Sequence, residues 1–207
     1  MTLAPIPDIQ IEFLLKKIRK GLLLANLEQE ASKEFLQFQS ALALQCFTNE
    51  YIYDEQNIEI KALNKLEVLV SSVLANGKQP SPNAILCLAS YKALHKYNWC
   101  DKLKVNAYIE EVYNRQVIEP NYESSLKSGI SVLKKIKDKV SSKVRTQYES
   151  NPYPRWVNTG LNLQPLPISK VLSLYKLKLF DHLIKEVEAP DISIAGCGTG
   201  QHSINSG

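Results

Sequence analysis

The sequence predicts a mainly helical protein that leads, near its end, into the start of an α/β domain. Apolar residues recur at three- and four-residue intervals over most of residues 8–147, as they do on the packed face of a helix. Prolines then gather within residues 148–165, where they exclude a continuous helix. A short apolar run at residues 192–195 leads directly into a glycine-rich turn. We therefore expect a helical domain at 1–147, a proline- and aromatic-rich linker at 148–165, and the start of a second domain at 166–207.

The helical domain should begin with an amphipathic helix over residues 8–27. Its apolar spacing predicts one buried face, made of Ile11, Leu14, Leu15, Ile18, Leu22 and Leu23. Asn76-Gly77, followed by a proline-marked loop, predicts a definite helix end in the middle of the domain. The expected helices after the first cover residues 32–50, 58–76, 82–99, 104–120, 121–149 and, in the second domain, 168–189.

The helix expected over residues 121–149 combines an apolar stripe with many lysines. The stripe consists of Leu126, Ile130, Leu133, Ile136, Val140 and Val144, and the lysines lie mainly outside it. A basic helix could bind an anion or nucleic acid, but no aromatic residues alternate with these lysines to stack on bases. We expect a solvated helix face, so nucleic acid is not indicated as a partner.

Composition limits the other function classes. The formal net charge is only +4, and the four cysteines form no CxxC pair and do not cluster with the three histidines. A metal site is therefore not expected. No signal peptide and no apolar run near the ~18 residues of a membrane helix are present in the sequence. With reduced cysteines, these features predict a cytoplasmic protein without a membrane partner.

The glycine turn after residue 195 carries chemical information. Glycine takes positive φ without steric cost and lets a ligand approach the backbone. Exposed amides at the start of the next helix favour an anionic or polar ligand group. The turn consists of Gly196, Cys197, Gly198, Thr199, Gly200 and Gln201.

Two nucleotide-binding loops do not fit this turn. A P-loop would need lysine and serine or threonine after its last glycine, where this chain has Gln201 and His202. The dinucleotide fingerprint GxGxxG would need its third glycine at Gln201.

"GCGTG" instead resembles the G-x-G-x-G loop of class I methyltransferases that use S-adenosylmethionine. The pair "YESNPYPRW" (148–156) and "IAGCGTGQHSI" is similar to a bacterial group of methyltransferase-domain proteins, many of which carry tetratricopeptide repeats further towards the N-terminus. The resemblance implies an incomplete Rossmann-like α/β methyltransferase domain that begins with this strand and loop. It also implies that residues 196–201 bind S-adenosylmethionine. The family usually has an acidic residue two positions before the first glycine, where this chain has Ile194, so that contact is missing or comes from elsewhere.

Two interpretations of residues 148–156 stay open. Their aromatic rings offer apolar faces with polar tips, and Arg155 offers a fork for a carboxylate or phosphate, so the segment could be a lid over cofactor or acceptor. Alternatively, it is a rigid strap, because residues before proline are extended. The candidates for a lid or substrate contact are Tyr148, Asn151, Tyr153, Arg155 and Trp156.

The resemblance implies the N-terminal portion of a methyltransferase that acts on an unknown acceptor. Only seven residues follow Gly200, too few for the crossover to a second parallel strand. We therefore expect weak or no cofactor binding and no activity from this chain alone. His202 could be a general base and Cys197 a thiol of low pKa near a helix start, but the pattern assigns no catalytic residue. The alternative is a helical module that binds a protein partner and retains a vestigial cofactor loop.

Overall fold

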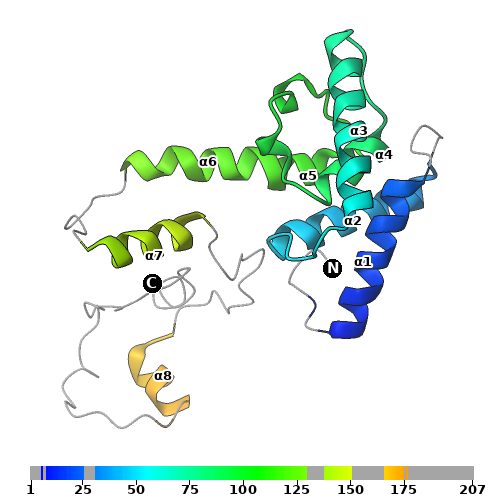
Figure 1. Ribbon diagram of the computed structural model, residues 1–207. Coiled ribbons are helices and arrows are strands. Elements are labelled where there is room, and N and C mark those ends of the chain that lie inside the picture. The colour runs from blue at the N-terminus through cyan, green and yellow to red at the C-terminus, as the bar shows by residue number, and fades with distance from the viewer. Residues whose placement is uncertain are drawn as a thin grey trace. The chain divides into compact units, whose positions relative to one another are not determined.

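The computed structural model describes residues 6, 8–25, 31–129, 138–150, 166–174 and 176 (Figure 1). The chain divides into two compact units, Met1–Asn151 and Pro152–Gly207. The described residues contain helices and turns but no strand, which confirms the mainly helical class for this part of the chain. The strand expected at 192–195 lies outside the described residues, and the predicted domain boundaries stay predictions.

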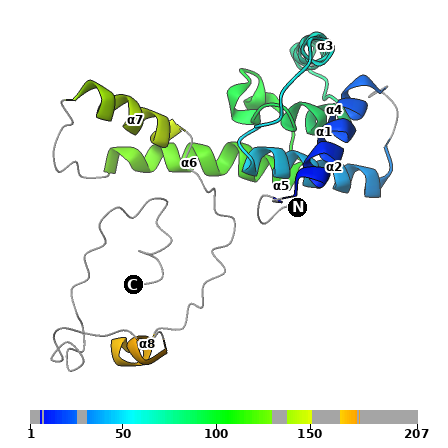
Figure 2. The same cartoon turned by 60° about the horizontal axis from the view of Figure 1, so that its bottom comes forward.

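The first unit contains most of the described α-helices. They are α1 (Ile9–Leu24), α2 (Lys33–Thr48), α3 (Asn57–Ala75), α4 (Pro82–Ala89), α5 (Glu110–Tyr113), α6 (Glu119–Leu126) and α7 (Lys139–Ser150). Short 3-10 turns lie at η1 (Leu94–Lys96), η2 (Cys100–Lys102) and η4 (Lys127–Gly129), and a π-helical turn, η3 (Asn114–Ile118), joins α5 to α6. In the second unit the structure describes α8 (Ile168–Leu174). Figure 2 shows α3 nearly end-on while α5 and α6 run across the page, so α3 runs in a different direction from α5 and α6.

Capping side chains fix where the first helices begin. The Asp8 carboxylate accepts from the backbone N–H of Gln10 at 2.9 Å and of Ile11 at 3.0 Å. Ser32 and Ser81 accept from the third residue beyond them, at 3.3 Å and 3.2 Å. Each cap satisfies a donor that the helix itself leaves free, so these starts follow from the local sequence.

Two hydrophobic clusters hold the first unit together. The main core is built around α2 and α4, and every residue from Asn83 to Ala89 is buried. It also takes in α3 and the segment from Tyr91 to Val117. The second, which we call the α1 cluster, is smaller and contains Leu15, Leu42, Cys46 and Tyr53, with Ile18, Leu22, Phe38 and Tyr51 partly buried against it.

The inner face of α1 differs from the predicted one. Leu15 and Leu23 are buried as expected, but Ile11 and Leu14 are 39% and 54% exposed. Arg19 takes their place, with only 1% of its surface exposed. The hydrophobic pattern missed this because it counts a charged residue as solvated.

The basic helix expected over residues 121–149 begins earlier and is interrupted. The α-helix starts at Glu119, ends at Leu126 and continues as a 3-10 turn to Gly129, a residue that weakens helices. α7 then covers Lys139–Ser150, and residues 130–137 of the stripe lie outside the described part. Leu126, Val140 and Val144 are exposed.

Candidate functional site

The structure does not describe the residues that the sequence predicts to bind the cofactor. Gly196, Cys197, Gly198, Thr199, Gly200 and Gln201 lie outside the described residues, as does His202. Of the lid candidates, Asn151, Tyr153, Arg155 and Trp156 also lie outside them. Tyr148 is in α7 and is 69% exposed.

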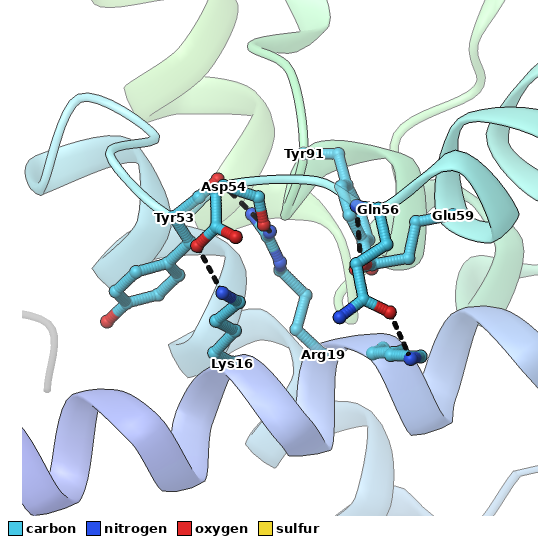
Figure 3. A network of polar contacts seen from close by, with 8 residues as sticks. Lys16, Arg19, Tyr53, Asp54, Gln56, Glu59 and Tyr91 are labelled. Carbon is cyan, nitrogen blue, oxygen red and sulfur yellow. Dashed lines mark hydrogen bonds and ion pairs between the residues drawn. The ribbon is translucent and has the colours of Figure 1, made fainter.

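A buried polar network lies instead between α1 and the segment that enters α3 (Figure 3). Arg19 is its centre. Its guanidinium donates to the backbone carbonyls of Tyr53 and Asp54, both at 3.4 Å. It also lies over the ring of Tyr91, 4.0 Å from the centroid, and 5.3 Å from that of Tyr53. Ring faces attract a cation, so aromatic contacts replace much of the hydration that Arg19 loses.

A carboxylate closes the network on the far side of Tyr91. The Tyr91 hydroxyl donates to Oε1 of Glu59 at 2.8 Å, and Glu59 is completely buried. The other carboxylate oxygen accepts from the backbone N–H of Gln56 at 3.0 Å, which forms a capping box at the start of α3. Burial, followed by this hydrogen bond to Glu59, raises the pKa of the Tyr91 phenol. Tyr91 therefore stays protonated and donates.

Two lysines of α1 reach the rim of the same network. Lys16 forms an ion pair with Asp54, and Lys20 donates to Oε1 of Gln56 at 2.6 Å. Lys16 holds the pKa of the Asp54 carboxyl below its usual range, first by hydrogen bonding and then by its charge. Three cationic residues on α1 thus contact the short segment 53–56.

Two buried thiols near Arg19 are unreactive. Burial raises the pKa of Cys46 and of Cys87 to about 12 each, although the charge of Arg19 opposes the shift. A thiolate is the nucleophilic form, so neither thiol is activated near neutral pH. Both side chains are small core residues.

A second polar side chain, Gln116, is buried in the main core. Its Oε1 accepts from the backbone N–H of Leu94 at 3.1 Å, and its Nε2 donates to the carbonyls of Ala89 at 3.0 Å and Ala43 at 3.3 Å. The π-helical turn that contains Gln116 lies between α5 and α6. One neutral amide therefore links α2, α4 and η1.

The two buried polar sites, around Arg19 and around Gln116, connect elements of the fold. The shallow depression of about 410 Å³ that we find is lined by α3 residues Asn64, Glu67, Val68 and Ser71, and by neither Arg19 nor Gln116. No group of three or more histidine, cysteine or acidic side chains in the described part could hold a metal ion. The contacts of Arg19 and of Gln116 are suited to holding helices together rather than to catalysing a reaction.

Sequence patterns missed these residues, although one signal was present. Gln56 and Glu59 have the spacing of a capping box, which places Glu59 in the first turn of α3. Nothing in the local sequence marks Arg19 or Gln116 as buried, since the partners of these side chains are 22 to 73 positions away and only the fold brings them together.

No protein-family model, curated protein or solved structure matches this chain. None of the described helices is long and apolar enough to cross a membrane.

Proposed function

We propose that this chain is the N-terminal portion of an S-adenosylmethionine-dependent methyltransferase whose methyl acceptor is unknown. The observation that carries the proposal is the apolar run 192–195 followed by Gly196, Gly198 and Gly200. The "YESNPYPRW" segment upstream supports it by resemblance. In this proposal the helices of the first unit form a scaffold that precedes the cofactor-binding domain.

Residues 196–201 would hold the cofactor. Glycines permit close approach of the backbone to a ligand, and free amides can donate to its carboxylate or ribose oxygens. When bound, the cofactor supplies an electrophilic methyl group. Arg155 and the aromatic residues around it would cover the cofactor or the acceptor.

Saturation-transfer NMR with S-adenosylhomocysteine tests this role, because it detects weak binding. We expect ligand signals with the 207-residue chain and their loss in Gly198→Val, whose side chain blocks the backbone. Gly21→Ala is the matched control, because a Cβ at Gly21 meets nothing within 4 Å. Equal signals from the chain and the Gly198 variant would exclude a cofactor role for this loop.

A second candidate function is a helical module that binds a protein. Two stripes of exposed apolar residues favour it: Ile118, Tyr122 and Leu126, and Val140, Val144 and Tyr148. Each repeats every four residues, which places its members on one side of a helix. Exposed apolar stripes of this kind can pack against an apolar surface of a partner protein. Loss of a purified complex on Tyr122→Ser, with the NMR signals above unchanged, would separate this function from cofactor binding.

A further inference from the structure

α1 is apolar around more of its circumference than its packing uses. Ile9, Phe13, Leu14 and Leu24 are 82%, 60%, 54% and 46% exposed. At about 100° per residue, Phe13, Leu14 and Leu24 lie on the side away from Leu15, Arg19 and Leu23, and Ile9 lies at the edge of that side. With Lys17 they form what we call the outer face of α1. Exposed apolar side chains gathered on one side of a helix mark a contact surface.

The charges around the outer face have one sign. Lys17 lies within it, with Nζ 4.2 Å from the centroid of the Phe13 ring. Lys16 and Lys20 lie along one edge of this face. Asp54 offsets the charge of Lys16, whereas the partner of Lys20, Gln56, is neutral and does not offset its charge. Glu12, the acidic residue within α1, lies on the inner side with Arg19. The face therefore complements an anionic surface.

Its shape favours a bilayer over a protein helix. The outer face is the convex side of a single 16-residue helix, about 24 Å long, and the depression described above involves α3 alone. A partner helix needs a groove to enter, whereas a membrane surface accepts a convex amphipathic helix lying flat. Lysine stems can extend along apolar surface and keep their charge at the headgroups.

We propose that the outer face of α1 binds the surface of membranes rich in anionic lipids. Phe13 and Leu14 enter the boundary between headgroups and acyl chains, and Lys17 and Lys20 lie near the lipid phosphates. The sequence predicted no membrane partner because it lacks a spanning segment, and a peripheral contact needs none.

Vesicle co-sedimentation tests the proposal. The probes are phosphatidylcholine vesicles with and without phosphatidylglycerol. We expect binding only to the anionic vesicles, weakened by added salt. The double variant Phe13→Ser/Leu14→Ser should bind about ten-fold more weakly, and Lys17→Glu should also lose about ten-fold or more. Val68→Ser is the matched control: Val68 is 69% exposed but lies on α3, so its change should leave binding within about two-fold.

A depth measurement separates insertion from simple charge attraction. Phe13→Trp should show more quenching by brominated acyl chains than the parent protein, and Val68→Trp should not. All substituted side chains are exposed, so circular dichroism should show an unchanged fold. Equal binding by the parent and the Phe13/Leu14 variant would overturn the proposal, as would no binding to anionic vesicles. Binding to soluble polyglutamate but not to vesicles would also overturn it, and would indicate an acidic protein partner.

Discussion

Two regions of the first unit each contain a buried polar side chain. The main core contains a neutral amide, and the contact between α1 and residues 53–56, which we call the seam beneath α1, contains a charged group. In the main core, the neutral amide of Gln116 makes three hydrogen bonds to backbone groups, at 3.0 to 3.3 Å. In the seam, Arg19 brings a buried charge that makes two bonds of 3.4 Å, and its Nε has no hydrogen-bond partner among the described residues. The first arrangement is almost fully satisfied, and the second depends on aromatic rings.

This difference has a consequence for how firmly each part is held. A buried amide that satisfies three backbone groups is costly to replace, because each unpaired group retains its desolvation cost. A buried cation with imperfect bonding carries its own desolvation cost, so an apolar residue of similar size can take its place at little loss. α1 should therefore tolerate loss of charge at its centre better than the core tolerates loss of the amide.

One substitution at both sites tests this directly. Gln116→Met should lower the free energy of unfolding by about 2 kcal/mol, since it leaves the buried Leu94 N–H unpaired and removes the bonds to the Ala43 and Ala89 carbonyls. Arg19→Met should lower it by about 1 kcal/mol or less, because methionine fills the space beside Tyr91 without a buried charge. Urea unfolding, followed by circular dichroism, measures both values.

Arg19→Ala provides the control for packing. It removes the contact with Tyr91 as well as the charge, so it should cost about 3 kcal/mol or more. If Arg19→Met proved as damaging as Arg19→Ala, the charge itself would hold α1, and the proposed contrast between the regions would be wrong.

The two regions can also be compared through one cysteine in each, Cys46 in the α1 cluster and Cys87 in the main core. Both have a pKa of about 12 in the folded protein, against 9.0 for an ordinary thiol. Because the folded pKa is the higher one, the stabilisation is complete below about pH 9 and is lost as pH rises towards 12. At about pH 10.5 each cysteine should remove about 2 kcal/mol relative to pH 7.

Alanine variants measure the two contributions separately. Cys46→Ala and Cys87→Ala should each reduce the fall in unfolding free energy between pH 7 and pH 10.5 by about 2 kcal/mol. Urea unfolding at both pH values gives the difference, which cancels the cost of the cavity. A fall that persists undiminished in the double variant would assign the alkaline instability to tyrosines instead.

The fold class could be predicted because it depends on local patterns. Asp8, Ser32 and Ser81 sit where capping rules place helix starts, and Gly77 ends α3 as expected. The burial of Arg19 could not be predicted, because its ring and carbonyl partners lie on other segments. The end of α6 at Leu126 was missed because the apolar stripe continues in the sequence. The cofactor loop lies outside the described residues, so its prediction rests on the motif alone.

Two helix ends with corresponding hydrogen bonds provide a smaller test of local rules. After α3, Gly77 has φ 71°, and Lys78 N–H donates to Val73 at 3.1 Å. After α2, Glu50 occupies the equivalent position with φ 54°, and Tyr51 N–H donates to Cys46 at 2.9 Å. This left-handed conformation disfavours any residue with a Cβ. One end is therefore strained and the other is not.

Exchanging the residue types should move stability in opposite directions. Gly77→Ala should lower the free energy of unfolding by about 1 kcal/mol, although a Cβ there meets nothing within 4 Å. Glu50→Gly should raise it by about 0.5 kcal/mol, because greater freedom of the unfolded chain offsets part of the gain. Thermal unfolding of both variants measures the shifts, and two changes of the same sign would contradict the conformational argument.

The smallest effect is expected at the rim of the seam, where Lys16 pairs with Asp54. The Asp54 side chain is 77% exposed, so solvent screens this pair. The variant Lys16→Ala should therefore unfold at the same urea midpoint as the parent protein. Lys16→Ala should nevertheless return the pKa of Asp54, now held low, to its usual range. Because the folded pKa is the lower one, any stabilisation from this pair exists above the ordinary aspartate pKa and is lost as pH falls through the folded value. NMR titration of the Asp54 carboxyl measures the pKa in both proteins. An unshifted pKa would remove Lys16 as its cause, and a large loss of stability would mean that the rim, rather than Arg19, holds α1.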